Sequence, residues 1–150
     1  MRVVLDTNIL ARATPGRDSP ARRVLLRVIE PPHLLVLSPF LLTELAQVLR
    51  YERVQRIHRL DDEKLNHFLT QLQSDALIVP LPHAPSDAVV PSDPEDDPVI
   101  ATAVRGQAQV ICTLDRHFQH PDVQTYCADE GNRTLTEVEL LALFLEDEGQ

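Results

Sequence analysis

Continuous runs of apolar residues recur along the chain, and they constrain its fold more than any other feature. Such runs lack the apolar and polar alternation of a strand with one exposed face, so each one indicates a buried strand. The clearest runs are RVVLD at 2–6, HLLVLS at 33–38, ALIVPL at 76–81 and QVICTLD at 109–115. We therefore expect a sheet that is covered on both faces.

Helical patterns separate these runs. Ser19 and Pro20 suit the N-cap and the first position of a helix, and the apolar residues after them repeat at helical spacing. Helical patterns cover 19–30, 39–50, 61–73 and 134–148, the last with Thr134 or Thr136 as its cap. Strands that alternate with such helices indicate a parallel sheet with right-handed crossovers. The predicted fold is a three-layer α/β/α sandwich, formed as one domain by residues 1–150.

A proline-rich segment interrupts this alternation. Residues 79–94 contain five prolines, which remove backbone donors and disfavour a helix. We expect an extended surface segment here, followed by a helix over 96–106.

The charge is unevenly divided along the chain. The formal net charge is -9, but residues 1–60 hold 10 basic and 5 acidic residues, whereas residues 61–150 hold 4 basic and 18 acidic residues. A basic surface can therefore lie beside an acidic one, so the negative total does not exclude a nucleic-acid ligand.

The cysteines and the hydropathy pattern point to a cytoplasmic protein. Cys112 and Cys127 are too few for a disulfide framework, and we expect both as reduced core thiols. No apolar run reaches the roughly 20 residues of a membrane span, and the N-terminal MRVVLDTN lacks the pattern of a signal peptide. We expect no membrane association.

Carboxylates follow several of the predicted strands. Asp6 and Asp115 come just after strands, Glu44 lies in the first turns of a helix, and four acids cluster at 93–97. The carboxyl ends of parallel strands meet at one edge of a sheet, where ligand sites form. Carboxylates gathered there repel one another unless a cation is present, and Mg²⁺ prefers oxygen ligands. One or two such ions can activate water for attack on phosphorus, which is nuclease chemistry.

Four segments carry a resemblance to a known family. VVLDTNIL at 3–10, TELAQVL at 43–49, DPEDDPVIATA at 93–103 and VICTLD at 110–115 resemble the four acidic motifs of the PIN domain family, in their usual order. The resemblance spans about the whole chain and is closest to the bacterial toxin–antitoxin branch that includes the VapC-type toxins. It implies an α/β/α fold and a Mg²⁺- or Mn²⁺-dependent endoribonuclease.

The resemblance also implies the site residues. The catalytic acids of the family fall on Asp6, Glu44, Asp96 and Asp115, with Asp6 and Asp96 as the main metal ligands and Asp93 and Asp97 as auxiliary acids. Thr7, Asn8 and Thr113 are their polar neighbours. Helix chemistry leaves one assignment open, because Pro98 suits the first helical position and makes Asp97 the N-cap. We expect Asp96 to be the metal-site residue.

Simpler interpretations exist for each acid taken alone. Asp6 with its polar neighbours is typical of a turn, Glu44 of a solvent-facing helix residue, and the 93–97 cluster of a soluble loop with a cap. All of these acids, however, agree with one geometry at the strand ends, and this agreement favours a functional site.

Several arginines are candidates for contacts to RNA phosphates. The alternative for a regular row of arginines is a solvated helical face. The candidates are Arg12, Arg17, Arg22, Arg23, Arg50 and Arg53.

Other chemistries fit the sequence less well. The four glycines, at 16, 106, 131 and 149, permit neither a P-loop nor a dinucleotide fingerprint. The only lysine, Lys64, lies in a predicted helix, unlike the lysine of a receiver domain. His117 and His120, taken with the two cysteines, match no common zinc spacing. We expect the two histidines on a surface loop.

The leading hypothesis is thus a metal-dependent endoribonuclease and toxin, with an RNA substrate, a small protein antitoxin as partner, and a homodimer as a further option. The apolar residues of 135–145 either form that interface or pack on the sheet. The alternative is a PIN-like module with weak or no catalysis that acts by binding a partner.

Overall fold

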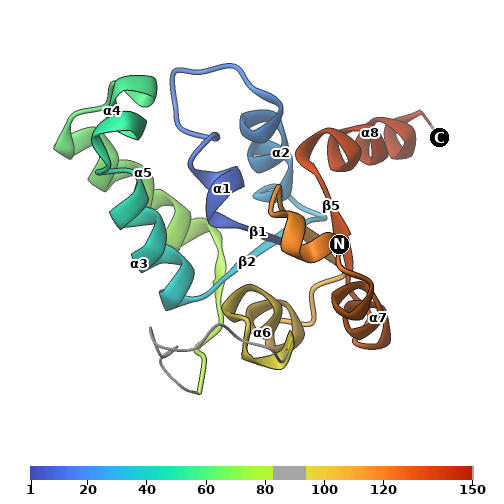
Figure 1. The fold of residues 1–150 in the computed structure, drawn as a ribbon. Helices are drawn as coiled ribbons and strands as arrows, with labels where there is room; N and C mark the ends of the chain where they lie inside the picture. Colours follow the sequence, from blue (N-terminus) through green and yellow to red (C-terminus); the bar gives the residue numbers. More distant parts are fainter. Residues whose placement is uncertain (83–93, 150) are drawn as a thin grey trace.

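The structure is a computed structural model that describes residues 1–82 and 94–149. Its centre is a five-stranded parallel sheet in the order β3-β2-β1-β4-β5 (Figure 1). The strands are β1 (Arg2–Leu5), β2 (Leu34–Leu37), β3 (Leu77–Ile78), β4 (Val110–Cys112) and β5 (Arg133–Leu135). In register, Val3 lies opposite Leu35 on one side and Val110 on the other. The predicted parallel sheet is confirmed.

Helices connect the strands. They are α1 (Thr7–Leu10), α2 (Pro20–Val28), α3 (Pro39–Val48), α4 (Glu52–His58), α5 (Asp62–Asp75), α6 (Pro98–Arg105), α7 (Pro121–Asp129) and α8 (Glu137–Glu148). Two 3₁₀ turns, η1 (Pro94–Asp96) and η2 (Arg116–Gln119), precede α6 and α7.

Polar caps define where the helices begin. The Ser19 side chain accepts a hydrogen bond from the Arg22 amide, and Pro20 is the first residue of α2, as predicted. Thr136 caps α8 through a reciprocal pair of bonds with Glu139, a capping box. Each cap satisfies backbone donors that have no partner inside the helix.

The order in which the chain adds strands to the sheet determines which face each helix covers. From β1 the chain adds β2 and then β3 on one side, and after β3 it crosses to add β4 and β5 on the other side. Right-handed crossovers then place helices on opposite faces. Figure 1 shows α2 and α8 on one side of the sheet and α6 and α7 on the other, as in the predicted α/β/α sandwich.

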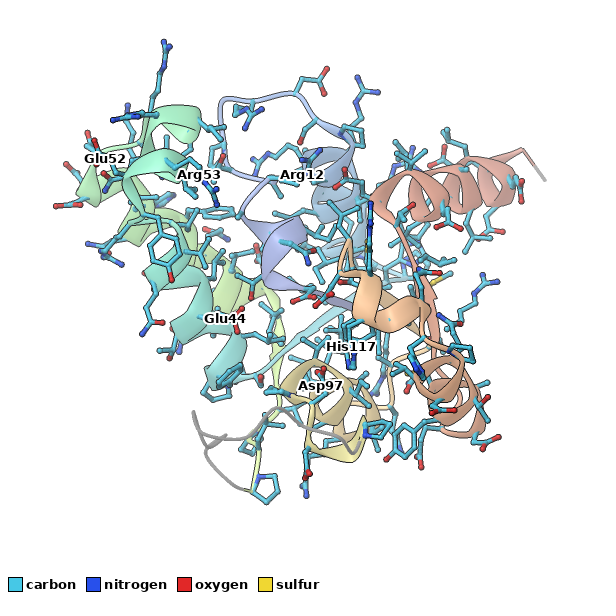
Figure 2. All side chains as sticks on the ribbon, in the orientation of Figure 1. Arg12, Glu44, Glu52, Arg53, Asp97 and His117 are labelled. Atoms are coloured by element: carbon cyan, nitrogen blue, oxygen red, sulfur yellow. The ribbon has the colours of Figure 1, made fainter. Side chains whose placement is uncertain are left out.

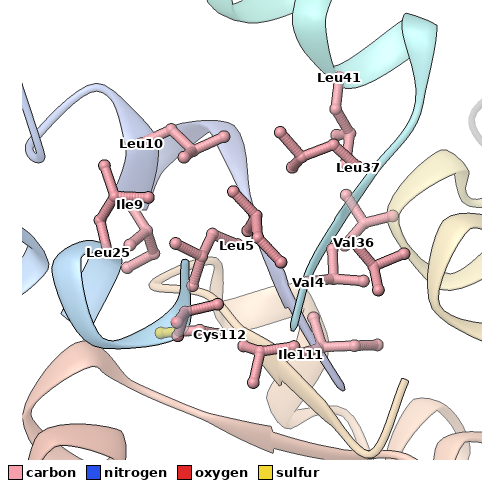
Figure 3. Packing of buried hydrophobic residues seen from close by; sticks show 14 of the residues in the cluster. Val4, Leu5, Ile9, Leu10, Leu25, Val36, Leu37, Leu41, Ile111 and Cys112 are labelled. Carbon is pink, nitrogen blue, oxygen red and sulfur yellow. The ribbon is translucent and has the colours of Figure 1, made fainter. Parts of the chain in front are cut away.

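Apolar side chains of the sheet fill the space between the layers (Figure 3). Val4 and Leu5 of β1 are fully buried, as are Val36 of β2 and Ile111 of β4. Each such side chain contributes about 1.5–3 kcal/mol relative to exposure. This packing makes β1 and β4 a rigid base for the residues that follow them.

The structure confirms one of the two caps predicted for the last helix, Thr136, so that α8 begins at Glu137. The part of the predicted helix before this cap is different, because Thr134 and Leu135 belong to β5. A three-residue edge strand leaves little trace in the sequence, because pairing with β4 and not an apolar run defines it. The predicted extended segment at 79–94 lies mostly outside the described residues. None of the helices described is long and apolar enough to cross a lipid bilayer.

Candidate active site

The site lies at the topological switch point of the sheet, where the strand order reverses. The chain leaves β1 toward β2, but it leaves β4 toward β5 on the opposite side. Loops therefore diverge at the carboxyl ends of β1 and β4, which is where open α/β sheets form ligand crevices. Asp6 directly follows β1, and Thr113 directly follows β4.

Asp6 is the buried centre of this edge, with 7% of its surface exposed. One carboxylate oxygen, Oδ1, accepts a hydrogen bond of 2.7 Å from the amide of Thr7 and so caps α1. The other, Oδ2, accepts one of 2.7 Å from the Thr113 hydroxyl. Burial raises the pKa of Asp6, these two bonds oppose the rise, and the charges of Asp97 and Asp115 add to it.

Asn8 joins the two strand ends. Its Nδ2 donates to Asp6 Oδ2 at 3.3 Å and to Thr113 Oγ1 at 3.4 Å, and its Oδ1 accepts from the Leu114 amide at 3.1 Å. Among the residues that the structure describes, the hydrogen-bond donors to the Asp6 carboxylate are all uncharged. The network therefore orients the carboxylate without neutralising it.

Glu44 approaches Asp6 from α3 and is partly buried. Burial raises the pKa of Glu44, and repulsion from Asp6 and Asp97 raises it further. The Thr7 hydroxyl lies near Glu44 without a well-formed hydrogen bond. It lowers the pKa of Glu44, but not enough to offset burial and repulsion. Ser38, the N-cap of α3, accepts a 2.9 Å hydrogen bond from Thr102 of α6, which fixes the two helices that carry Glu44 and Asp97.

Asp97 stands at the start of α6. Its Oδ1 accepts from the amides of Val99 at 2.8 Å and Ile100 at 3.3 Å, so it is the N-cap that the position of Pro98 predicts. Its side chain is only 14% exposed. Burial raises the pKa of Asp97, the two amides and His117 oppose the rise, and the charge of Asp115 adds to it.

Asp96 lies elsewhere. It ends η1, is exposed, and lines a separate surface pocket with Ile100, Ala101, Val104, Arg105 and Tyr126, among others. Consecutive residues at a helix start point in different directions, so the carboxylate that caps α6 faces the strand ends and its predecessor does not. The structure thus brings Asp97, rather than Asp96, to Asp6 and Glu44. Asp93, the other auxiliary acid, lies outside the described residues.

Asp115 and His117 complete the site from η2. Asp115 is exposed, and its Oδ1 accepts a 2.9 Å hydrogen bond from the His117 amide. His117 Nε2 lies 3.8 Å from Asp97 Oδ2. Figure 2 shows Glu44, Asp97 and His117 around one region, contributed by α3, α6 and η2.

The arrangement fits a divalent cation by its donor chemistry. Asp6, Glu44 and Asp97 all have raised pKa values because of burial and repulsion from neighbouring carboxylates, and the hydrogen bonds to Asp6 leave its charge in place. Within residues 1–82 and 94–149, no three His, Cys, Asp or Glu side chains stand close enough together to hold an ion as they are placed. Mg²⁺ keeps several waters and commonly takes one or two carboxylates, so the donors suit such an ion with water completing its shell.

Four of the six candidate arginines are already engaged. Arg12 pairs with Glu137 at 3.1 Å, and Arg23 forms two hydrogen bonds to Asp18. Arg22 and Arg50 donate to the backbone carbonyls of Ala13 and Ala46. These contacts stabilise local structure and occupy donors that a phosphate would need.

Arg17 and Arg53 are different. Their side chains form no hydrogen bond or ion pair with any residue that the structure describes. Arg53 lies on α4, and its guanidinium is available to a phosphate.

Two residues at the ends of strands or beside the acids are absent from the predicted site. The sequence predicts His117 on a surface loop, although its distance of two residues from Asp115 is a usable signal. Glu137, buried at 4% exposure, follows β5 and is a further acid at a strand end. Only the position of β5 reveals it, and β5 is not predictable from the sequence.

The fold and the site together define a class of protein, a three-layer α/β/α domain with carboxylates where the strand order of a parallel sheet reverses. Residues 2–117 match the PIN domain, and the chain belongs to the PIN domain family. A solved structure, a PilT N-terminus domain protein from the hyperthermophilic archaeon Sulfolobus solfataricus P2, is similar in fold, with a TM-score of 0.50 and 14% sequence identity. The similarity covers 97% of this chain and 95% of that one. No curated protein matches the sequence significantly.

Proposed function

We propose that the protein is a Mg²⁺- or Mn²⁺-dependent endoribonuclease that hydrolyses phosphodiester bonds of RNA. One observation carries the proposal: Asp6, Glu44 and Asp97 converge where the strand order of the sheet reverses, and burial with repulsion from neighbouring carboxylates raises the pKa of each. Membership of the PIN domain family supports the same chemistry.

The proposed role of each residue follows from its position in the site. Asp6 and Asp97 would hold the ion, with Asp97 in the role predicted for Asp96, because the Asp97 carboxylate is buried near Asp6 whereas Asp96 is exposed. When bound, a divalent ion supplies positive charge that activates water and stabilises an in-line displacement at phosphorus. Thr113 and Asn8 hold the Asp6 carboxylate in one orientation. Glu44 and Asp115 border the pair and can orient the attacking water.

The biological role in this proposal is that of the toxin in a type II toxin–antitoxin system of the cytoplasm. The resemblance of the four acidic motifs to the VapC-like branch supports this role. A free ribonuclease harms its host, so the role requires a small protein antitoxin that binds the chain. Growth arrest on expression of wild type but not of Asp6→Asn, with relief by a co-expressed neighbouring gene product, is the expected outcome.

The direct test is RNA cleavage by purified protein without an affinity tag. Wild type, Asp6→Asn and a matched control, Asp62→Asn on the exposed start of α5, are incubated with structured and unstructured RNAs in Mg²⁺, Mn²⁺ or chelator. We expect Asp6→Asn to lose at least about 100-fold in rate, because even a group that only supports a metal ligand is worth about 10–100-fold. The control keeps its rate.

Two outcomes would contradict the proposal. Undiminished metal-dependent cleavage by Asp6→Asn would remove the site from the chemistry. Absence of Mg²⁺ and Mn²⁺ binding by wild type in calorimetry would instead favour a PIN-like module that acts by binding a partner.

A further inference from the structure

The imidazole of His117 faces the carboxylate of Asp97. It comes from η2, where the Asp115 carboxylate accepts a hydrogen bond from its backbone amide at 2.9 Å. Its ring meets the buried Phe118 ring edge to face, with centroids 5.7 Å apart and an interplanar angle of 76°. These two contacts anchor His117 in η2, and its partly exposed ring approaches Asp97 at the start of α6.

The distance between His117 and Asp97 lies within the range of separations between two ligands of one metal ion. Nε2 and Oδ2 are 3.8 Å apart. Donor atoms bound at about 2.0–2.2 Å to the same ion are separated by about 3 Å when adjacent and up to about 4.4 Å when opposite. As a simple ion pair the contact would contribute little, since the His117 side chain is 46% exposed.

The chemistry of the donors then decides which ion is favoured. Mg²⁺ takes oxygen ligands, whereas imidazole nitrogen suits transition metals, whose affinity rises from Mn²⁺ toward Co²⁺ and Ni²⁺. An ion that touches both Asp97 Oδ2 and His117 Nε2 gains from the nitrogen only if it is a transition metal.

We propose that His117 supplies a nitrogen ligand to the carboxylate site and makes the site prefer Mn²⁺ and Co²⁺ over Mg²⁺. The inference rests on the proposed metal site, and it concerns which ion binds rather than whether RNA is cut. Asp97 supplies an oxygen ligand, His117 supplies the nitrogen, and water completes the shell. Asp6 and Glu44 add the negative charge that any divalent ion requires.

The test compares metal affinities in tag-free protein. His117→Gln replaces the nitrogen donor by a neutral oxygen donor, and His67→Gln on the exposed face of α5 is the matched control. Mn²⁺ affinity is measured by the loss of the free-ion paramagnetic resonance signal, and Mg²⁺ affinity by calorimetry. We expect His117→Gln to lower the ratio of Mn²⁺ to Mg²⁺ affinity by about 10-fold or more, while His67→Gln leaves it unchanged.

A spectroscopic measurement on the wild type alone covers the case in which a variant fails to fold. Spin-echo modulation of bound Mn²⁺ is expected to show coupling to one ¹⁴N nucleus, which changes to ¹⁵N when histidine is labelled. Lack of nitrogen coupling, or an unchanged affinity ratio in His117→Gln, would overturn the proposal. Neither readout requires cleavage. Nitrogen-coupled Mn²⁺ in a protein that leaves RNA intact would uphold this inference and defeat the proposed function, and cleavage without nitrogen coupling would do the reverse.

Discussion

At the scale of single residues, Asp97 combines two tasks in one carboxylate. Oδ1 caps α6 through the amides of Val99 and Ile100, and Oδ2 faces His117. Asn is as good an N-cap as Asp, but it carries no charge. A substitution by Asn therefore separates the structural task from the chemical one.

We predict that Asp97→Asn folds with its stability kept or slightly raised and loses at least about 100-fold in RNA cleavage. Stability is kept because the cap remains and a repelling charge is removed from beside Asp115. Thermal unfolding and cleavage rates in Mn²⁺ check the two parts.

Asp96→Asn is the adjacent control. Its side chain is exposed, so we expect its rate to stay within about 3-fold of wild type, below the 10-fold cost of disturbing even a supporting group. A loss in Asp96→Asn that equals the loss in Asp97→Asn would return the metal-site assignment to Asp96.

This pair of residues shows what the sequence can predict about the site. Asp6, Glu44 and Asp115 follow from their places in the family motifs, and the structure sets all three at one edge. The choice between Asp96 and Asp97 depends on the direction of a side chain at a helix start. Capping chemistry at Pro98 predicts correctly that Asp97 is the N-cap, whereas the position in the motif favours Asp96 as the metal-site residue.

At the scale of elements, the end of α6 is packed against β2 with no room to spare. A Cβ atom added at the buried Gly106 would collide with Val36 Cγ1, and it would lie 3.1 Å from the Thr102 carbonyl oxygen. Relief requires α6 or β2 to move, and α6 carries Asp97 at its other end.

We predict that Gly106→Ala lowers the free energy of unfolding by about 1–3 kcal/mol, the usual cost of overpacking. Gly149→Ala is the matched control, because its new Cβ would meet nothing closer than 3.5 Å, and it should change stability by less than about 0.5 kcal/mol. Urea unfolding of both variants measures the difference. Equal stability of the two would mean that α6 shifts without cost.

Helix α4 offers a comparison between two arginines one turn apart. Arg56 pairs with Glu52 at 2.6 Å, whereas Arg53 pairs with no described residue. A paired guanidinium releases fewer counterions when it meets a phosphate, because its charge is already partly neutralised. Figure 2 shows Glu52 and Arg53 on this helix.

We predict that Arg53→Ala weakens RNA binding and reduces the slope of log affinity against log salt by about 1, while Arg56→Ala changes the slope less. Fluorescence anisotropy across a salt series, in an Asp6→Asn background that leaves RNA intact, measures both. Identical slopes in wild type and Arg53→Ala would place the RNA path away from α4.

The strands also show which elements sequence patterns predict and which they do not. The runs that form β1, β2 and β4 are apolar on both faces, so the sequence predicts them and their parallel arrangement. The edge strand β5 reads RTL, half-exposed and only three residues long, and only its bonds to β4 define it. Glu137 therefore escapes prediction, although it follows β5 as Asp6 follows β1.

At the scale of the whole molecule, the acidic site opposes the stability of the fold. Asp6, Glu44 and Asp97 all have raised pKa values in the folded protein, chiefly through burial. The folded state thus holds more protons than the unfolded state between the ordinary values near 4 and the raised values. Linkage then makes the free energy of unfolding fall as pH rises through that window.

His33 acts in the opposite direction. Burial lowers the pKa of His33, with further lowering from the N-terminal amine, so its contribution to stability is lost as pH falls through its ordinary range near 6.5. The pH profile of the wild type alone therefore mixes two opposing effects. The difference between wild type and a site variant isolates the carboxylates, because His33 is common to both.

We predict that Asp6→Asn, in chelator, is more stable than wild type at pH 7.5 and that this advantage shrinks as pH falls through the raised pKa of Asp6. At neutral pH the variant removes a buried charge and its repulsion from Asp97 and Asp115, although Asn must replace the hydrogen bonds of the carboxylate. Each kcal/mol gained raises the melting temperature by about 2–4 °C in a chain of this size. Added Mn²⁺ should reverse the order, because it binds the folded wild type and stabilises it in proportion to its saturation. Calorimetric melting of both proteins at several pH values, with and without Mn²⁺, measures all of these effects. An Asp6→Asn advantage that is constant with pH and unaffected by Mn²⁺ would mean that neither proton nor metal competes for this carboxylate.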